Sequence, residues 1–152
     1  NKLDNLDAQL ELSNGNQIDL LNEKIKAYED LAMATESSLL YKRDRAMELG
    51  RRLSLEYGFK VNDDGTIDNT AERLTKLRDT LSDTEFDAVN DYLQEYFDVA
   101  LDEIPDLEKQ LLEYQKDLKD VQREKLETTK KIEDEITKIY EKQIEVTNSL
   151  LC

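Results

Sequence analysis

Histidine and tryptophan are absent from this chain of 152 residues, and cysteine and proline occur once each. Without histidine there is no His-based acid–base catalyst and no His metal ligand. The only cysteine, Cys152, excludes a disulfide within the chain and is typical of a reducing compartment. We interpret Cys152 as incidental. We therefore expect no catalytic residues, no cofactor and no metal site, and we expect that the protein is not an enzyme.

Positive charge and long apolar runs are also scarce. The chain has 36 acidic and 21 basic residues, a net charge of −15. This balance argues against a nucleic-acid partner and against an anionic membrane surface, because both require clustered Lys and Arg. No apolar run approaches the ~20 residues that a membrane span needs, and no signal peptide is visible. We expect no nucleic acid, no membrane contact from this segment and no small-molecule substrate.

Charged residues are as frequent as apolar ones, at 38% each, and glycine occurs four times. This composition is typical of long helices that carry a narrow apolar seam. A seam buries less surface per residue than a globular core, so we expect stability to depend on partner chains. Because the first residue is Asn1 rather than Met, we also expect a fragment of a longer protein or a processed product.

The first predicted part is a coiled-coil arm over residues 1–57. Leu3, Leu6 and Leu10 have helical spacing, and Asn14-Gly15 interrupts the pattern. From about residue 16, apolar residues alternate in steps of three and four, which is a heptad pattern. The arm is predicted to end near Tyr57-Gly58, where the glycine can cap the helix.

Residues 58–82 are predicted to form a tip made of a small β-hairpin and a short helix. Phe59 and Val61 alternate with polar residues, as in a half-buried strand, and Asp63-Asp64-Gly65 supplies a turn. We expect Gly65 to adopt a conformation that favours glycine. Thr70 is predicted to cap a helix over about 71–81. A calcium loop with Gly65 as its sixth position fails, because its first and twelfth positions are not carboxylates.

Residues 83–152 are predicted to form the second coiled-coil arm. Ser82 and Glu85 form a capping box that places its start. Pro105 is predicted to kink or break the helix, because it lacks an N–H and clashes with the preceding turn. The apolar seam then continues to Leu150, weakened near Lys125 by a register shift.

These patterns together predict a mainly α fold, a long antiparallel helical hairpin or coiled coil with the β-hairpin and short helix at its tip. The predicted interaction seam consists of Ile18, Leu21, Ile25, Leu39, Leu49, Leu53, Leu107, Leu111, Leu118, Val121, Ile132 and Ile139. The predicted tip residues are Phe59, Val61, Gly65 and Ile67.

Acidic residues recur every three or four positions at the start of the second arm. They are Asp83, Asp87, Asp91, Glu95, Asp98 and Asp102. Three interpretations stay open: a solvated face, pairing with the basic end of the first arm, or a loosely held divalent cation. If the arms fold back around residue 70, Arg52 faces the neighbourhood of Asp87, Arg45 that of Glu95, and Lys42 that of Asp98.

Two stretches carry a family resemblance. Tyr57-Gly58-Phe59-Lys60-Val61 and Asp64-Gly65-Thr66-Ile67, set between coiled-coil arms, resemble a segment of phage tail tape-measure proteins, and residues 136–145 also look like these proteins. The resemblance implies a fragment of a very long protein that fills the tail tube, sets tail length and leaves ahead of the genome. It further implies a homo-oligomer or other tail proteins as partners, and a location in the virion tail or in the host cytoplasm during assembly.

The residues also fit a protein of another class. A helical-hairpin adaptor or chaperone-like binding module would grip a partner between its arms. The length of the parent gene discriminates, because a tape-measure protein has many hundreds of residues and an adaptor of this kind is free-standing.

Overall fold

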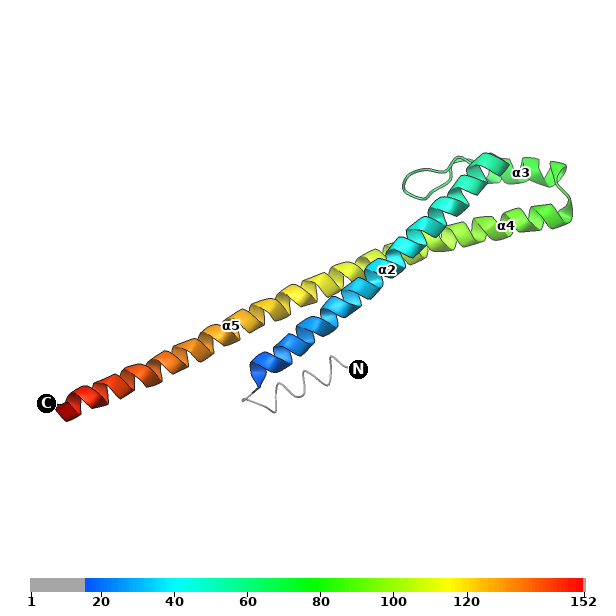
Figure 1. Cartoon of the computed structure of the whole chain (residues 1–152). Helices are drawn as coiled ribbons and strands as arrows, with labels where there is room; N and C mark the ends of the chain where they lie inside the picture. Colours follow the sequence, from blue (N-terminus) through cyan, green and yellow to red (C-terminus); the bar gives the residue numbers. More distant parts are fainter. Residues whose placement is uncertain (1–15, 152) are drawn as a thin grey trace. The chain divides into compact units, whose positions relative to one another are not determined.

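The structure is a computed structural model that describes residues 16–151, and it is mainly helical, as predicted (Figure 1). The chain forms α2 (Gln17–Tyr57), α3 (Thr70–Thr80), α4 (Asp83–Phe97), a π-helical turn η1 (Asp98–Glu103) and α5 (Ile104–Leu151). The heptad pattern of the first arm was expected to run from about residue 16 to Tyr57, and α2 covers this stretch and confirms its end. The helical spacing predicted for Leu3, Leu6 and Leu10, and the terminal Cys152, lie outside the described residues.

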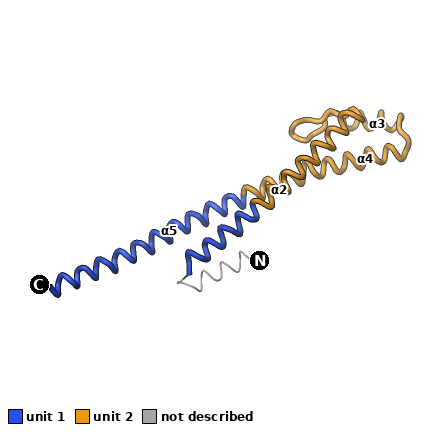
Figure 2. The backbone as a smooth tube through the Cα atoms, in the orientation of Figure 1, with its two compact units in different colours: residues 1–32, 113–152 blue, residues 33–112 orange. Residues whose placement is uncertain are grey.

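The chain divides into two compact units, which are coloured separately in Figure 2. Unit 1 contains residues 1–32 and 113–152, and unit 2 contains residues 33–112. α2 and α5 each contribute to both units. Each unit therefore combines sequence from both predicted arms, and the predicted tip lies entirely in unit 2.

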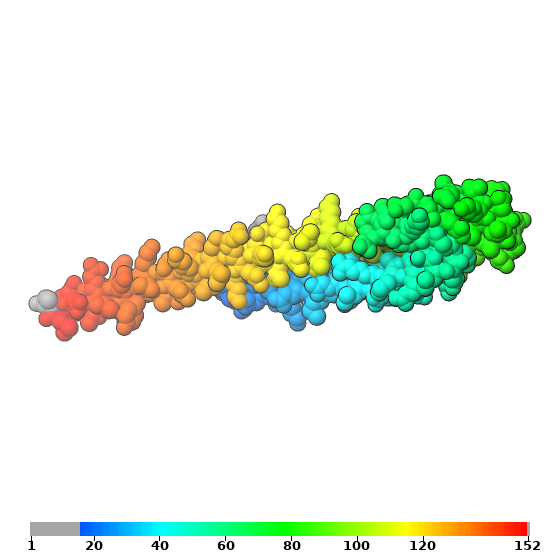
Figure 3. All heavy atoms as spheres, turned by 90° about the horizontal axis from the view of Figure 1, so that it is seen from above, coloured from blue at the N-terminus to red at the C-terminus, as the bar shows by residue number. Residues whose placement is uncertain are grey.

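Unit 2 has an apolar core where α3 and α4 meet the last turns of α2. In Figure 3 the green atoms of α3 and α4 lie against these turns. The buried core cluster consists of Leu49, Leu53, Phe59, Leu77, Val89, Leu93 and Tyr96. Every element of the unit from α2 to α4 supplies at least one of these side chains, so the core holds the tip to the helix that precedes it.

The connection from α2 to α3 is a structured loop, and the predicted β-hairpin is not formed. Among the described residues the only β pairing is an isolated antiparallel bridge between Val61 and Ile67. The residues between these two form a turn in which Asn62 N–H donates to the Thr66 carbonyl at 2.8 Å. Polar side chains complete the turn, and the Asp64 carboxylate accepts from the Thr66 hydroxyl at 2.6 Å. The segment is too short for a ladder, because the turn uses the residues that would extend it.

Two glycines reverse the chain at the ends of this region. Gly58 has φ +74° directly after α2, and Gly65 has φ +90° in the turn. Both values lie in the region where only glycine is free of steric cost, which confirms the prediction for each. Arg73 of α3 lies beside Gly58 and donates from Nε to the Tyr57 carbonyl at 2.9 Å, so it satisfies an acceptor at the end of α2.

The predicted start of α4 is confirmed, and that of α3 is wrong in its capping residue. Ser82 is the N-cap of α4, and its hydroxyl accepts from Glu85 N–H at 3.2 Å. The N-cap of α3 is Asn69, while Thr70 is the first helical residue. The Asn69 side chain does not cap the helix, because it accepts from Lys60 N–H at 2.7 Å and donates to the Gly58 carbonyl. Asn69 therefore ties the loop together.

Of the kink or break predicted at Pro105, the break is not formed. The backbone stays helical from Asp98 into α5, and the disturbance takes the form of the π-helical turn η1. Ile104 N–H donates to the Val99 carbonyl, five residues earlier, instead of to the carbonyl four residues earlier. Pro105 follows as the second residue of α5. The widened turn before it accommodates a residue that has no N–H to donate.

Unit 1 pairs the start of α2 with the middle of α5. These segments lie side by side in both Figure 1 and Figure 3. Leu21 and Ala27 of α2 and Val121 of α5 are buried in this unit, with exposed fractions of 1%, 6% and 5%. Beyond about residue 130, no described segment covers α5, and its apolar side chains are exposed.

Candidate functional site

The predicted seam residues fall into three groups by burial. Leu21, Leu39, Leu49, Leu53 and Val121 are buried. Ile18, Ile25, Leu107, Leu111 and Leu118 are half-buried, and Ile132 and Ile139 are exposed. Of the tip residues, Phe59 is buried in the core of unit 2, and Val61, Gly65 and Ile67 are half-buried. The seam is therefore covered along its first part and open toward its end.

The strongest polar contact in unit 2 joins α2 to α4. Arg45 donates from Nε and Nη2 to the two carboxylate oxygens of Glu95, at 2.8 and 3.0 Å. This bidentate pair is the one that the antiparallel alignment predicted. A bidentate pair fixes the orientation of the two side chains as well as their distance. The hydrogen bonds from Arg45 lower the pKa of the Glu95 carboxyl below its ordinary value, and burial opposes this shift.

The other predicted charge pairs are wrong in their partners. Lys42 Nζ lies 3.2 Å from Glu103, and not beside Asp98. Arg52 pairs within its own helix with Glu56, at 3.8 Å, and its guanidinium lies 4.8 Å from the centre of the Tyr92 ring. In unit 2, α2 therefore forms antiparallel charge pairs with α4 and η1, but most of the acidic stripe takes no part in them.

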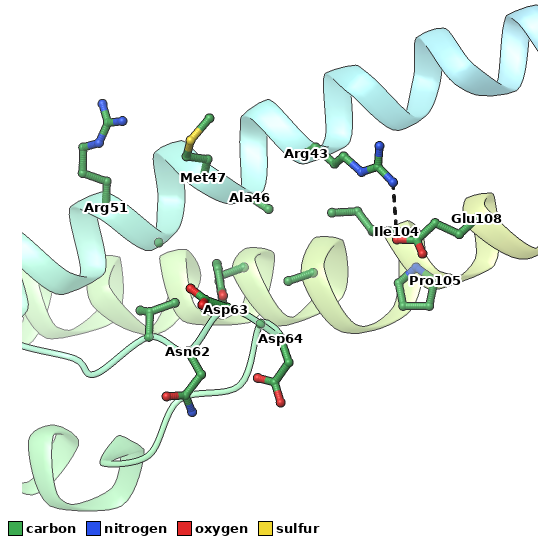
Figure 4. A pocket seen from close by; sticks show the side chains of 15 residues that line it. Arg43, Ala46, Met47, Arg51, Asn62, Asp63, Asp64, Ile104, Pro105 and Glu108 are labelled. Atoms are coloured by element: carbon green, nitrogen blue, oxygen red, sulfur yellow. Dashed lines mark ion pairs between the residues drawn. The ribbon is translucent and has the colours of Figure 1, made fainter.

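Unit 2 also contains a groove that sequence reasoning missed. It lies between α2, the 61–65 loop and the region around Pro105, and it has a volume of about 620 Å³ (Figure 4). Its polar lining carries both signs of charge, with Arg43 of α2 facing Glu108 of α5 at 3.8 Å. The rest of the lining includes Ala46, Val61, Ala100 and Ile104.

The groove exists because of two features that local patterns do not reveal. Small residues line its floor, since Gly50 lets the Tyr96 ring approach to within 3.2 Å of where a Cβ would stand. The turn at Gly65 also packs against the π-helical turn, with Ala100 Cβ 3.2 Å from the corresponding position. Gly50, Gly65 and Pro105 mark these places in the sequence, but local patterns reveal neither the close approach of Tyr96 nor the form of the helical turn before Pro105. The lining offers charges of both signs and apolar surface.

The exposed end of α5 is the second candidate surface. Ile132, Ile136, Ile139, Gln143, Val146 and Leu150 alternate in steps of four and three, and we call them the distal seam. Their apolar members are between 38% and 83% exposed. A helix with an apolar stripe at this spacing normally buries it against another helix. Within residues 16–151 no other helix supplies that cover.

Residues 16–151 contain neither a metal site nor a membrane span. No group of three or more Cys, Asp or Glu side chains there is placed to hold a metal ion. No helix in the same range combines the length and the hydropathy needed to cross a membrane. Comparisons with protein-family models, curated proteins and solved structures give no match for this chain.

Proposed function

We propose that the protein is a structural coiled-coil segment that self-associates through the distal seam. The observation that carries this proposal is the uncovered apolar stripe of α5, on which Ile139 is 69% exposed and Leu150 is 83% exposed. A stripe of this kind is costly in water, and burial of an Ile or Leu side chain stabilises an assembly by about 1.5–3 kcal/mol. The proposed occupant is the same helix of a second copy.

The seam itself favours a copy of the same helix as its partner. Its spacing is that of a coiled coil, in which identical helices pack the same positions against one another. Gln143 is the one polar residue in the seam. In a parallel, in-register pair the two Gln143 amides face each other and can form hydrogen bonds, whereas a shift by one heptad sets each against an apolar residue. A single polar seam residue of this type fixes the register at a cost in stability.

The more specific proposal is that this coiled coil belongs to a phage or prophage tail tape-measure protein, where it helps to set tail length and occupies the tail tube. The resemblance of residues 57–67 and 136–145 supports it, and α5 has the extended form that such a part requires. The partners would be further copies or other tail proteins, in the virion tail or in the host cytoplasm during assembly. The long antiparallel hairpin expected from the sequence remains part of this proposal, supported by the antiparallel charge pairs of unit 2.

Self-association is tested by a charge placed on the seam. Ile139→Lys is expected to shift the chain toward smaller species, measured by sedimentation velocity over a concentration series. Glu145→Lys is the matched control, since residue 145 lies on the opposite side of α5, and it should leave the assembly unchanged. A monomeric parent chain, or equal effects of the two variants, would contradict the proposal and favour the adaptor alternative, in which the groove of unit 2 holds a partner.

The tail assignment needs its own experiment, in the parent gene. Deletion of residues 108–149, about six heptads, should shorten the tail by about 60 Å if one helix residue spans ~1.5 Å of tail. Electron micrographs of purified particles measure this length. Tails of unchanged length would contradict the tape-measure proposal and leave self-association standing.

A further inference from the structure

A second apolar stripe lies on α2, on the side that faces away from the core of unit 2. Met33, Leu40, Met47 and Leu55 are 64%, 61%, 58% and 78% exposed. The first three are seven residues apart, so they lie on one face of the helix. The buried Leu49 and Leu53 lie about 200° around the helix from Met47 and Arg51 respectively. The stripe is therefore not an edge of the core.

Two opposite charges complete this stripe, which we call the outer face: Met33, Leu40, Asp44, Met47, Arg51 and Leu55. Asp44 and Arg51 are exposed, and neither has an ion-pair partner among the described residues. Other basic residues of this part of α2, such as Arg45, do have partners. Met47 and Arg51 also stand at the α2 edge of the groove of unit 2, and in Figure 4 their side chains extend away from the 62–64 loop.

We propose that the outer face binds the outer face of a second copy, with the two α2 helices antiparallel and a twofold axis between residues 47 and 48. In this alignment residue i faces residue 95 − i of the partner. Asp44 then meets Arg51 of the other copy twice, once on each side of the axis. Leu40 meets Leu55 in the same way, and the two Met47 side chains pack at the centre. From Leu40 to Leu55 the face is thus complementary to itself, which an isologous dimer requires.

The charges select this orientation over the parallel one. A parallel, in-register pair would set Asp44 against Asp44 and Arg51 against Arg51, and like charges facing each other are unfavourable. Shifting the antiparallel pair by one heptad separates Asp44 from Arg51 and leaves one leucine of each pair without its partner. Methionine at the centre adapts its shape to such a contact, because its side chain is flexible and polarizable.

This interface is separate from the distal seam, so it is tested where the seam is disabled. The background is the full chain with Ile139→Lys and Cys152→Ser. In it, Met47→Cys should be joined between copies by a short bis-maleimide, because residue 47 lies beside the axis. Met33→Cys is the matched control, since two residues at position 33 would stand about 43 Å apart along antiparallel helices. Linkage of both variants would indicate a parallel pair and overturn the proposal, as would linkage of neither.

A charge reversal tests the pairing of Asp44 with Arg51 directly. In the same background, Asp44→Arg should weaken the dimer about tenfold, because two attractive pairs become repulsive. Arg51→Asp should do the same, and the double variant should restore dimerisation, since it exchanges the two partners. Both positions are exposed, and circular dichroism verifies that the helices are intact. If the double variant is as weak as either single variant, the proposed alignment is wrong.

Discussion

Replacement of Gly65 by valine should destabilise unit 2 through the loop that joins α2 to α3. The backbone at Gly65 has φ +90°, where an L side chain costs about 1–2 kcal/mol and a β-branched one more. An added Cβ would also stand 3.2 Å from Ala100 Cβ and 3.3 Å from Leu101 Cδ2. Overpacking of this kind costs about 1–3 kcal/mol. The lower entropy of the unfolded chain returns about 0.4–1 kcal/mol, which leaves a net loss of about 2–4 kcal/mol.

The assay must report on unit 2 alone, because far-ultraviolet circular dichroism averages over every helix. Hydrogen exchange of amides in the core segments around Leu53 and Leu93 does so, and their protection should fall by the same free energy. Gly65→Asn separates the two costs, since asparagine tolerates positive φ but keeps the crowding, and it should lose about half as much. Asp63→Ala, exposed in the same turn, should change stability by less than about 0.5 kcal/mol. Unchanged protection in Gly65→Val would refute the packing of this turn against the π-helical turn.

The remaining predictions concern single polar contacts, each measured by urea unfolding. Arg45 lowers the pKa of the Glu95 carboxyl in the folded chain. The Arg45–Glu95 pair therefore contributes its full stabilisation above the ordinary glutamate pKa, and this stabilisation is lost as the pH falls through the lowered pKa. Glu95→Gln should therefore flatten the acid side of the stability profile, and an unaltered profile would show that the pair is not linked to folding. Ser82→Ala should cost about 1 kcal/mol by removing the cap of α4, while Ser82→Asp should retain most of it. Asn69→Ala should cost about 0.5–1.5 kcal/mol, because it removes the hydrogen bonds to Lys60 N–H and the Gly58 carbonyl, and a neutral result would mean that water replaces the amide.

Local chemistry predicted the ends of elements well. Ser82 has both a hydroxyl that can cap and a glutamate three residues later, so the start of α4 could be read directly. Gly58 and Gly65 occupy the positive φ values that only glycine adopts cheaply. Asn69 shows the limit of such reasoning. Its side chain can cap a helix or bond to a loop, and only the position of the Lys60 backbone, set by the tertiary fold, decides between them.

The β-hairpin prediction failed for a related reason. Alternation of Phe59 and Val61 with polar residues is a strand pattern, and both side chains do point into apolar surroundings. The pattern reports burial on one side and does not report whether a ladder of backbone bonds forms. In this loop the N–H groups of Thr66 and Lys60 donate to the side chains of Asp64 and Asn69, and the pairing between the two segments is limited to one bridge.

The predicted pairing of the acidic stripe was wrong because of a single turn of helix. An α-helix would continue the face of Glu95 through Asp98 and Asp102. A π-helical turn accommodates one extra residue, which rotates everything after it by about 100°. The continuing face then passes through Val99, which is buried, and Glu103, which pairs with Lys42 at 3.2 Å. The predicted partner of Lys42 was therefore wrong because a regular helix was assumed.

The position of this turn follows from Pro105. Proline cannot donate to the carbonyl four residues earlier, and its ring clashes with that carbonyl in a regular α-helix. A break would relieve the clash, but it would expose Val99, which is buried while the helix continues. A π-helical turn relieves it while the backbone stays helical on both sides. The sequence thus located the disturbance but not its form, because the form depends on what the next turn must bury. The same turn lies against the loop glycine, which links the groove of unit 2 to the one proline of the chain.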